Sequence, residues 1–129
     1  MHHIFYPDGD AEKISWVIQT NESRAEQSRI HAEMYKDKVT GIQSKYIALH
    51  VGLFWGIGTF IIKNEDSIKI MLDEKTMYEH FTSDSEIEDD LIVKKIHFIK
   101  QLIAQRKLEI KLEMICTQDN LARKNFQPK

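Results

Sequence analysis

The 129-residue chain has little cysteine, little proline and almost no excess of charge of either sign. Its single cysteine, Cys116, excludes an intramolecular disulfide and a cysteine-based zinc finger. A reducing, cytoplasmic location is therefore our default expectation. The two prolines, Pro7 and Pro128, lie close to the ends, so no proline-rich linker divides the chain. We predict a single domain over residues 1–129.

The charges nearly cancel, because 18 lysines and arginines stand against 20 aspartates and glutamates. A net charge of −2 provides no general basic field that would attract nucleic acid or anionic lipid. Charge therefore does not favour a nucleic-acid partner, and such binding would need a local basic patch. The composition, 42% hydrophobic and 29% charged, is typical of a globular domain rather than of a disordered or fibrous chain.

What the sequence does contain is a run of seventeen residues, Tyr46 to Ile62, without Asp, Glu, Lys or Arg. A membrane-spanning helix needs about 20 apolar residues. The run also contains three glycines, which weaken a helix, and many β-branched and aromatic residues, which suit a sheet. Apolar side chains alternate from Ile47 to Leu53 as they do in a strand. We therefore predict sheet core here and no contact with a membrane.

Residues 10–39 fit two patterns. Ile14 to Thr20 is rich in β-branched residues and predicts a strand, which a helix would follow with Ser23 and Glu26 as its capping box. The alternative is one long helix capped by Asp10, because several side chains follow the four-three spacing of a coiled coil. We favour the strand followed by a helix, and the second interpretation stays open.

The second half of the chain has clearer patterns. A long apolar stripe, preceded by Ser85 and Glu88 as a capping box, indicates a helix that covers a sheet. A strictly alternating segment follows it and predicts a strand. The predicted elements are a hairpin of residues 59–63 and 67–73, a helix over 86–106, a strand over 108–116 and a short helix over 120–126.

The element order predicted from Tyr46 to Phe126, strand, strand, strand, helix, strand, helix, resembles the front half of the ribonuclease H-like fold. In that family a first strand with a carboxylate and a glycine leads into two antiparallel strands. A helix with a second carboxylate and a strand ending in a third follow them. The segments that carry the resemblance are ALHVG, GIGTFIIKNEDSIKIMLD, KKIHFIKQLIAQ and EMICTQDN.

The resemblance implies three catalytic candidates. The third acid matches Asp119, whereas the first falls on His50 and the second near His97. The two histidines stand where a two-metal site would have carboxylates to activate water and neutralise the leaving oxygen. The resemblance therefore implies a degenerate nuclease site, which convergence of the three residues around one metal would support.

A ferredoxin-like arrangement, β-α-β-β-α-β from Ile14 to Cys116, explains the same pattern. In either case we predict an α+β domain. Its sheet would be mainly antiparallel, with four or five strands, and the helix over residues 86–106 would cover one face.

For function, our main expectation is a non-catalytic interaction or regulatory module that acts as a homo-oligomer. The predicted core brings together no acid, base and nucleophile, and Phe54, Trp55 and Phe60 would stay uncovered on the second sheet face. One alternative is a ribonuclease H-like protein that processes or binds nucleic acid with His50, His97 and Asp119. Another is a small-ligand binder with His50 as the polar anchor of its pocket. The residues identify neither a cofactor nor a metal.

Overall fold

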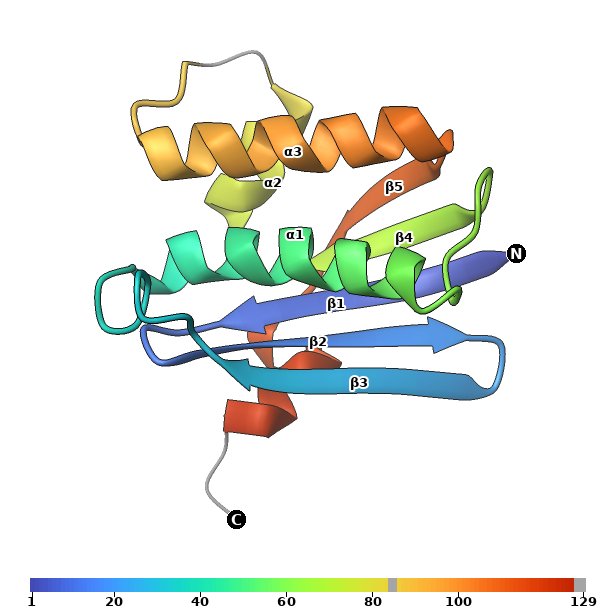
Figure 1. The fold of residues 1–129 in the computed structure, drawn as a ribbon, viewed down its shortest axis with the longest axis horizontal. Helices are drawn as coiled ribbons and strands as arrows, with labels where there is room; N and C mark the ends of the chain where they lie inside the picture. Colours follow the sequence, from blue (N-terminus) through green and yellow to red (C-terminus); the bar gives the residue numbers. More distant parts are fainter. Residues whose placement is uncertain (84–85, 127–129) are drawn as a thin grey trace.

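A computed structural model describes residues 1–83 and 86–126, in which five strands form one sheet flanked by helices (Figure 1). The strands are β1 (His2–Gly9), β2 (Lys13–Thr20), β3 (Ser23–Ile30), β4 (Ser67–Leu72) and β5 (Glu109–Met114). The helices are α1 (Gly41–Gly58), α2 (Lys75–Thr82) and α3 (Asp90–Arg106), and two 3-10 turns follow, η1 (Thr117–Asp119) and η2 (Leu121–Phe126).

The strand order in the sheet is β3-β2-β1-β4-β5, with β1 in the centre. β3, β2 and β1 pair antiparallel, whereas β4 pairs parallel to β1 and β5 parallel to β4. The parallel pairs arise because helices carry the chain back before each of these strands begins. The predicted α+β class, the five strands and the covering helix are confirmed, and the sheet is mixed.

α1 replaces the strands predicted over residues 46–62, so that prediction is wrong, as is the first arm of the hairpin at 59–63. The helix lies on β1 and β2 and packs against α3 on another side (Figure 1). A helix enclosed in this way is apolar on several sides and lacks the polar face by which helices are recognised. Its start is marked by a capping box, in which the Thr40 hydroxyl accepts from the Gln43 N–H and the Gln43 side chain accepts from the Thr40 N–H.

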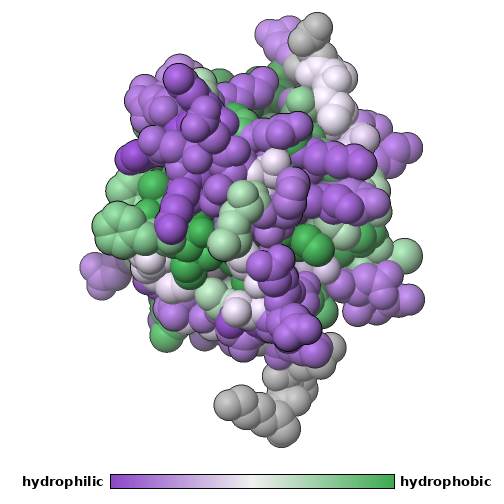
Figure 2. Space-filling view, turned by 90° about the vertical axis from the view of Figure 1, so that its right-hand side faces the viewer, coloured by the Kyte–Doolittle hydropathy of each residue, from purple (hydrophilic) through white to green (hydrophobic). Residues whose placement is uncertain are grey.

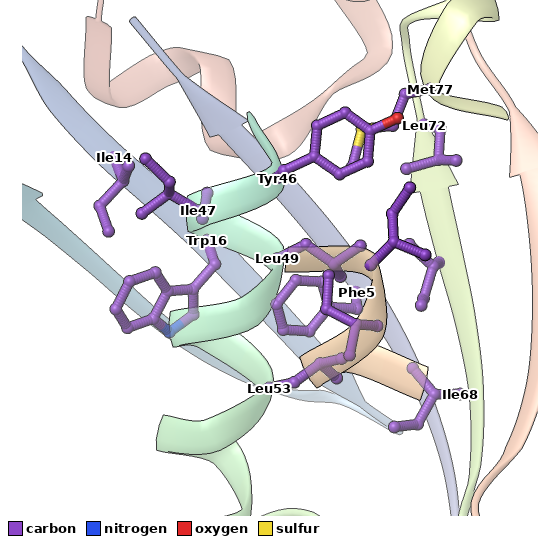
Figure 3. Packing of buried hydrophobic residues seen from close by; sticks show 14 of the residues in the cluster. Phe5, Ile14, Trp16, Tyr46, Ile47, Leu49, Leu53, Ile68, Leu72 and Met77 are labelled. Carbon is purple, nitrogen blue, oxygen red and sulfur yellow. The ribbon is translucent and has the colours of Figure 1, made fainter. Parts of the chain in front are cut away.

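Glycines let α1 approach the sheet closely. A Cβ added to Gly52 would lie 2.5 Å from the Phe5 ring and 2.9 Å from the Trp16 ring, and one added to Gly56 would lie 2.9 Å from Ile18 of β2. Figure 3 shows Phe5 and Trp16 beneath the helix together with its own apolar side chains. The glycines that suggested a strand thus serve helix-on-sheet packing.

The N-terminal part of the chain is a meander of three strands. The strand predicted at Ile14 to Thr20 is β2, but residues 23–30 form β3, so both helical interpretations are wrong. A two-residue turn with Asn21 at a φ of 55° joins β2 and β3. β3 is an edge strand with mostly exposed side chains, which explains why its sequence has no strand-like alternation.

The C-terminal elements agree with the prediction. α3 and β5 lie within the predicted ranges, and the final element is a 3-10 turn rather than an α-helix. Asp89 caps α3 by accepting from the N–H groups of Leu91 and Ile92. The expected cap Ser85 lies outside the described residues.

The surface of the molecule bears on the expectation of a homo-oligomer. The homo-oligomer expectation assumed that residues 46–62 were strands with two apolar faces, and this premise is wrong because they belong largely to α1. Figure 2 shows the end of the molecule with the β2–β3 turn, where hydrophilic side chains separate the apolar patches. Within residues 1–83 and 86–126, no helix is long and apolar enough to cross a membrane.

We predict that Ile99→Ala lowers the free energy of unfolding by about 2–5 kcal/mol, because this fully buried side chain of α3 would leave a cavity. Lys100→Ala, at the neighbouring exposed position, should change it by no more than about 0.5 kcal/mol. Urea denaturation of both variants measures the difference, and equal effects would contradict the observed helix face.

Candidate functional site

β1 and β4 end close to the start of α1 (Figure 1). Charged side chains from these three places form a cluster. Asp8 is next to last in β1, and Asp73 follows β4 directly. Because these two strands are parallel neighbours, their carboxyl ends lie side by side at the same end of the sheet. The first turns of α1 bring Lys45 to the same place. We call Asp8, Lys45 and Asp73 the central cluster.

The Lys45 ammonium lies among carboxylates. Its Nζ is 2.6 Å from Asp73 Oδ1, 3.6 Å from Asp8 Oδ1 and 3.7 Å from Glu74 Oε1. The side chains of Lys45, Asp73 and Asp8 are 8%, 1% and 0% exposed, whereas Glu74 lies at the rim with 44%. A buried lysine therefore neutralises buried acids that would otherwise repel one another.

Asp8 is the most enclosed member of the cluster. Its Oδ1 accepts from the Gly9 N–H at 2.8 Å, while Oδ2 has no hydrogen-bond partner among the described residues. Oδ2 lies 3.6 Å from the exposed guanidinium of Arg123, a contact of charge rather than a hydrogen bond. Burial raises the pKa of Asp8, although the Lys45 ammonium and the Gly9 N–H act in the opposite direction.

Asn120 closes the cluster from the C-terminal side. Its buried amide donates to Asp73 Oδ2 at 3.2 Å and to the Pro7 carbonyl at 3.0 Å, and its Oδ1 accepts from the Ala122 N–H. The Pro7 carbonyl is available because the pairing of β4 with β1 stops at Phe5. Both oxygens of Asp73 are thus engaged by cationic or amide donors.

The structure places the predicted site residues elsewhere. His50 of α1 stacks on Phe98 of α3, with ring centroids 5.4 Å apart, and His97 is exposed beside the same Phe98. Asp119 is an exposed residue of η1, directly before the buried Asn120. In the part of the chain that the structure describes, no hydrogen bond, ion pair or ring contact joins Asp119 to either histidine. Their catalytic roles stay a prediction that this geometry does not favour.

A sequence signal for the true cluster existed at the N-terminus. The segment Tyr6-Pro7-Asp8-Gly9 ends a strand with a carboxylate and a glycine, as the first strand of the ribonuclease H-like pattern does. The resemblance predicted from Tyr46 onward places the first acid at His50 instead, and the later acids are displaced with it. With Asp8 as the first acid, the helix position falls on Lys45 and the strand end on Asp73.

The structure is similar to ribonuclease H1 from the halophilic archaeon Halobacterium salinarum NRC-1, with a TM-score of 0.77, 16% sequence identity, and coverage of 95% of this chain and 91% of that one. For the N-terminal RNase H domain of a Mycobacterium tuberculosis protein the TM-score is 0.73 at 16% identity, covering 95% and 92% of the two chains. LC11-RNase H1, solved in complex with an RNA/DNA hybrid, gives 0.72 at 16% identity, covering 97% and 99%. No protein-family model and no curated protein sequence matches the chain.

The chain therefore has the ribonuclease H-like fold, and the ferredoxin-like alternative is wrong. The expectation of a non-catalytic interaction module acting as a homo-oligomer is corrected by the same finding. The structures that share this fold over nearly their whole length are nucleic-acid-processing enzymes by name.

The residues of the central cluster do not fit the pair of divalent ions that this fold implies. Two such ions need several carboxylates with free oxygens. Here an ammonium takes the central position, and an amide engages the second oxygen of Asp73. Among residues 1–83 and 86–126, no group of three or more His, Cys, Asp or Glu side chains is arranged to hold a metal.

We predict that His50 titrates at about 4, because burial and the Lys95 ammonium, 3.2 Å from its Nδ1, both lower its pKa. The unfolded chain binds this proton near pH 6.5, so the contribution of His50 to stability falls as the pH drops from about 6.5 towards 4. An NMR titration of the imidazole protons measures the midpoint. Lys95→Met should raise it only in part, because burial remains. A midpoint near 6.5 in the unmodified protein would contradict the observed packing.

Proposed function

We propose that this chain is a ribonuclease H-like nucleic-acid-binding protein that holds the backbone of an RNA-containing duplex with the exposed cations around the central cluster, Arg123, Lys124 and Lys75. The observation that carries the proposal is this cluster of Asp8, Lys45 and Asp73 at the carboxyl ends of β1 and β4. In open α/β sheets, ligands bind in the crevice outside these strand ends. The proposal includes a cytoplasmic location for the protein, as expected from its single cysteine.

The fold supports the class of ligand. One structure of similar fold, LC11-RNase H1, contains an RNA/DNA hybrid. We therefore take such a hybrid as the first ligand to test, and double-stranded RNA and DNA as comparisons. Sequence identity of 16% does not extend the activity of that enzyme to this chain.

Local charge supports contact with phosphates even though the net charge is −2. Arg123 is exposed on η2 and reaches to 3.6 Å from Asp8, and Lys124 is exposed beside it. Lys75, also exposed, begins α2 directly after Asp73 and Glu74. Phosphate contacts need exposed cations of this kind, which hold the backbone without reading its sequence.

The proposal assigns binding to the cluster rather than two-metal hydrolysis. In such hydrolysis, paired metal ions stabilise both the attacking and the leaving oxygen. The Lys45 ammonium already takes the place between Asp8 and Asp73. The function that this geometry supports best is nucleic-acid binding by a degenerate nuclease site, without hydrolysis.

We expect the purified protein to bind a labelled RNA/DNA hybrid at low salt, as measured by fluorescence anisotropy. Arg123→Ala should weaken binding and reduce the slope of log K against log salt by about 1, because one phosphate contact is lost. Arg106→Ala is the matched control, since this arginine is exposed at the far end of α3. Absence of binding to any duplex, or equal effects of the two variants, would contradict the proposal.

We also expect no magnesium-dependent cleavage of RNA/DNA hybrids, because the carboxylates needed for two ions are engaged by Lys45 and Asn120. Gel analysis of end-labelled hybrids after long incubation with magnesium, and separately with manganese, tests this. Cleavage that disappears in Asp73→Asn would show that the cluster is a working hydrolytic site and would replace binding by catalysis.

A further inference from the structure

The central cluster contains a positive charge of its own. Two buried carboxylates at the ends of neighbouring strands would destabilise the fold without a cation, because each has lost its hydration. Lys45 supplies that charge from α1, at 2.6 Å from Asp73 and 3.6 Å from Asp8. Its side chain is only 8% exposed, so the ammonium is held inside the cluster rather than at its rim.

An ammonium in this position competes with a divalent ion. Mg²⁺ binds oxygen at about 2.0–2.1 Å and requires a nearly complete octahedral set of oxygens. Asp73 Oδ1 faces Lys45, Asp73 Oδ2 accepts from Asn120, and Asp8 Oδ1 accepts from the Gly9 N–H. An ion bound to these oxygens would lie against the ammonium and be repelled by it.

One carboxylate oxygen of the cluster is left without a hydrogen bond from the described part of the chain and could contact a cation. Asp8 Oδ2 is completely buried and has no hydrogen-bond partner among the described residues. The nearest positive group is the Arg123 guanidinium at 3.6 Å. Two buried carboxylates thus face the same point, and that point is occupied by the ammonium of Lys45.

From this arrangement we infer that Lys45 is the resident cation of the cluster and stands in for a divalent metal. The protein then binds nucleic acid without a metal ion, and removal of the ammonium uncovers a cation site formed by Asp8 and Asp73. The inference deepens the proposed function, but its metal-binding part depends only on the geometry of the cluster.

The experiment compares Mn²⁺ binding by the full chain, Lys45→Glu and Lys45→Met, using calorimetry and electron paramagnetic resonance of the free ion. We expect no saturable site in the unmodified protein. Lys45→Glu, which adds a carboxylate, and Lys45→Met, which removes the charge, should each gain a saturable Mn²⁺ site, with an affinity at least about tenfold above the upper limit measured for the unmodified chain. Mn²⁺ should also raise the melting temperature of both variants relative to EDTA.

Two controls locate the site. Asp73→Asn introduced into the Lys45→Glu variant should abolish the new binding. Lys100→Glu, which makes the same charge change at an exposed position of α3, should bind no more Mn²⁺ than the unmodified protein. If Lys45→Glu fails to fold, Lys45→Met and the unmodified chain decide the question. Failure of a folded Lys45→Met to bind Mn²⁺ would overturn the inference, as would saturable binding by the unmodified protein that Asp73→Asn removes.

Hybrid binding separates this inference from the proposed function. If Lys45 replaces the metal, the affinity of the unmodified protein for an RNA/DNA hybrid should be the same in EDTA as in magnesium at equal ionic strength. Hybrid binding that requires magnesium would overturn the inference and leave the proposed function standing. Absence of hybrid binding, together with Mn²⁺ binding gained by Lys45→Met, would overturn the proposed function and leave the metal-binding inference standing.

Discussion

The ion pair between Lys45 and Asp73, with Asp8 beside it, joins α1 to the ends of the two central parallel strands. Burial makes each of these charges costly alone, so the three positions depend on one another. The same constraint fixes the start of α1 over the ends of these strands, and Gly52 and Gly56 let the rest of the helix lie closely on Phe5 of β1 and Ile18 of β2. The packing of the core and the chemistry of the edge are therefore set by one helix.

The fold of this protein is similar to that of ribonucleases H1, whereas its central cluster lacks the free carboxylates of a metal-dependent nuclease. Its sheet order and its similarity to ribonuclease H1 structures place it in the ribonuclease H-like fold. A shared fold does not imply a shared reaction, because the reaction depends on the side chains at the site. Here a lysine and an asparagine engage the acids that a metal-dependent nuclease would leave free for its ions.

How much of the site the sequence could reveal is clear from the individual residues. Asp8 could have been predicted as a site residue, because a strand that ends in Asp-Gly fits the first element of the ribonuclease H-like pattern. Lys45 and Asn120 were not, because no local pattern indicates that residues far apart in the chain will meet. The histidines were candidates because the resemblance, taken from Tyr46 onward, placed its first two acids at them, and the structure places His50 in a ring stack with Phe98.

By itself the sequence determined α3 and β5, whose apolar side chains repeat with the period of a helix and of a strand, and its β-branched residues favoured β2 without excluding a helix. Only the tertiary structure decided that residues 41–58 form a helix, because a segment enclosed between a sheet and another helix shows no polar face. It also decided that β1 is the central strand and that Asp8, Lys45 and Asp73 share one site. Such contacts depend on strand order and on the path of the helix over the sheet, which periodicity along the chain does not encode.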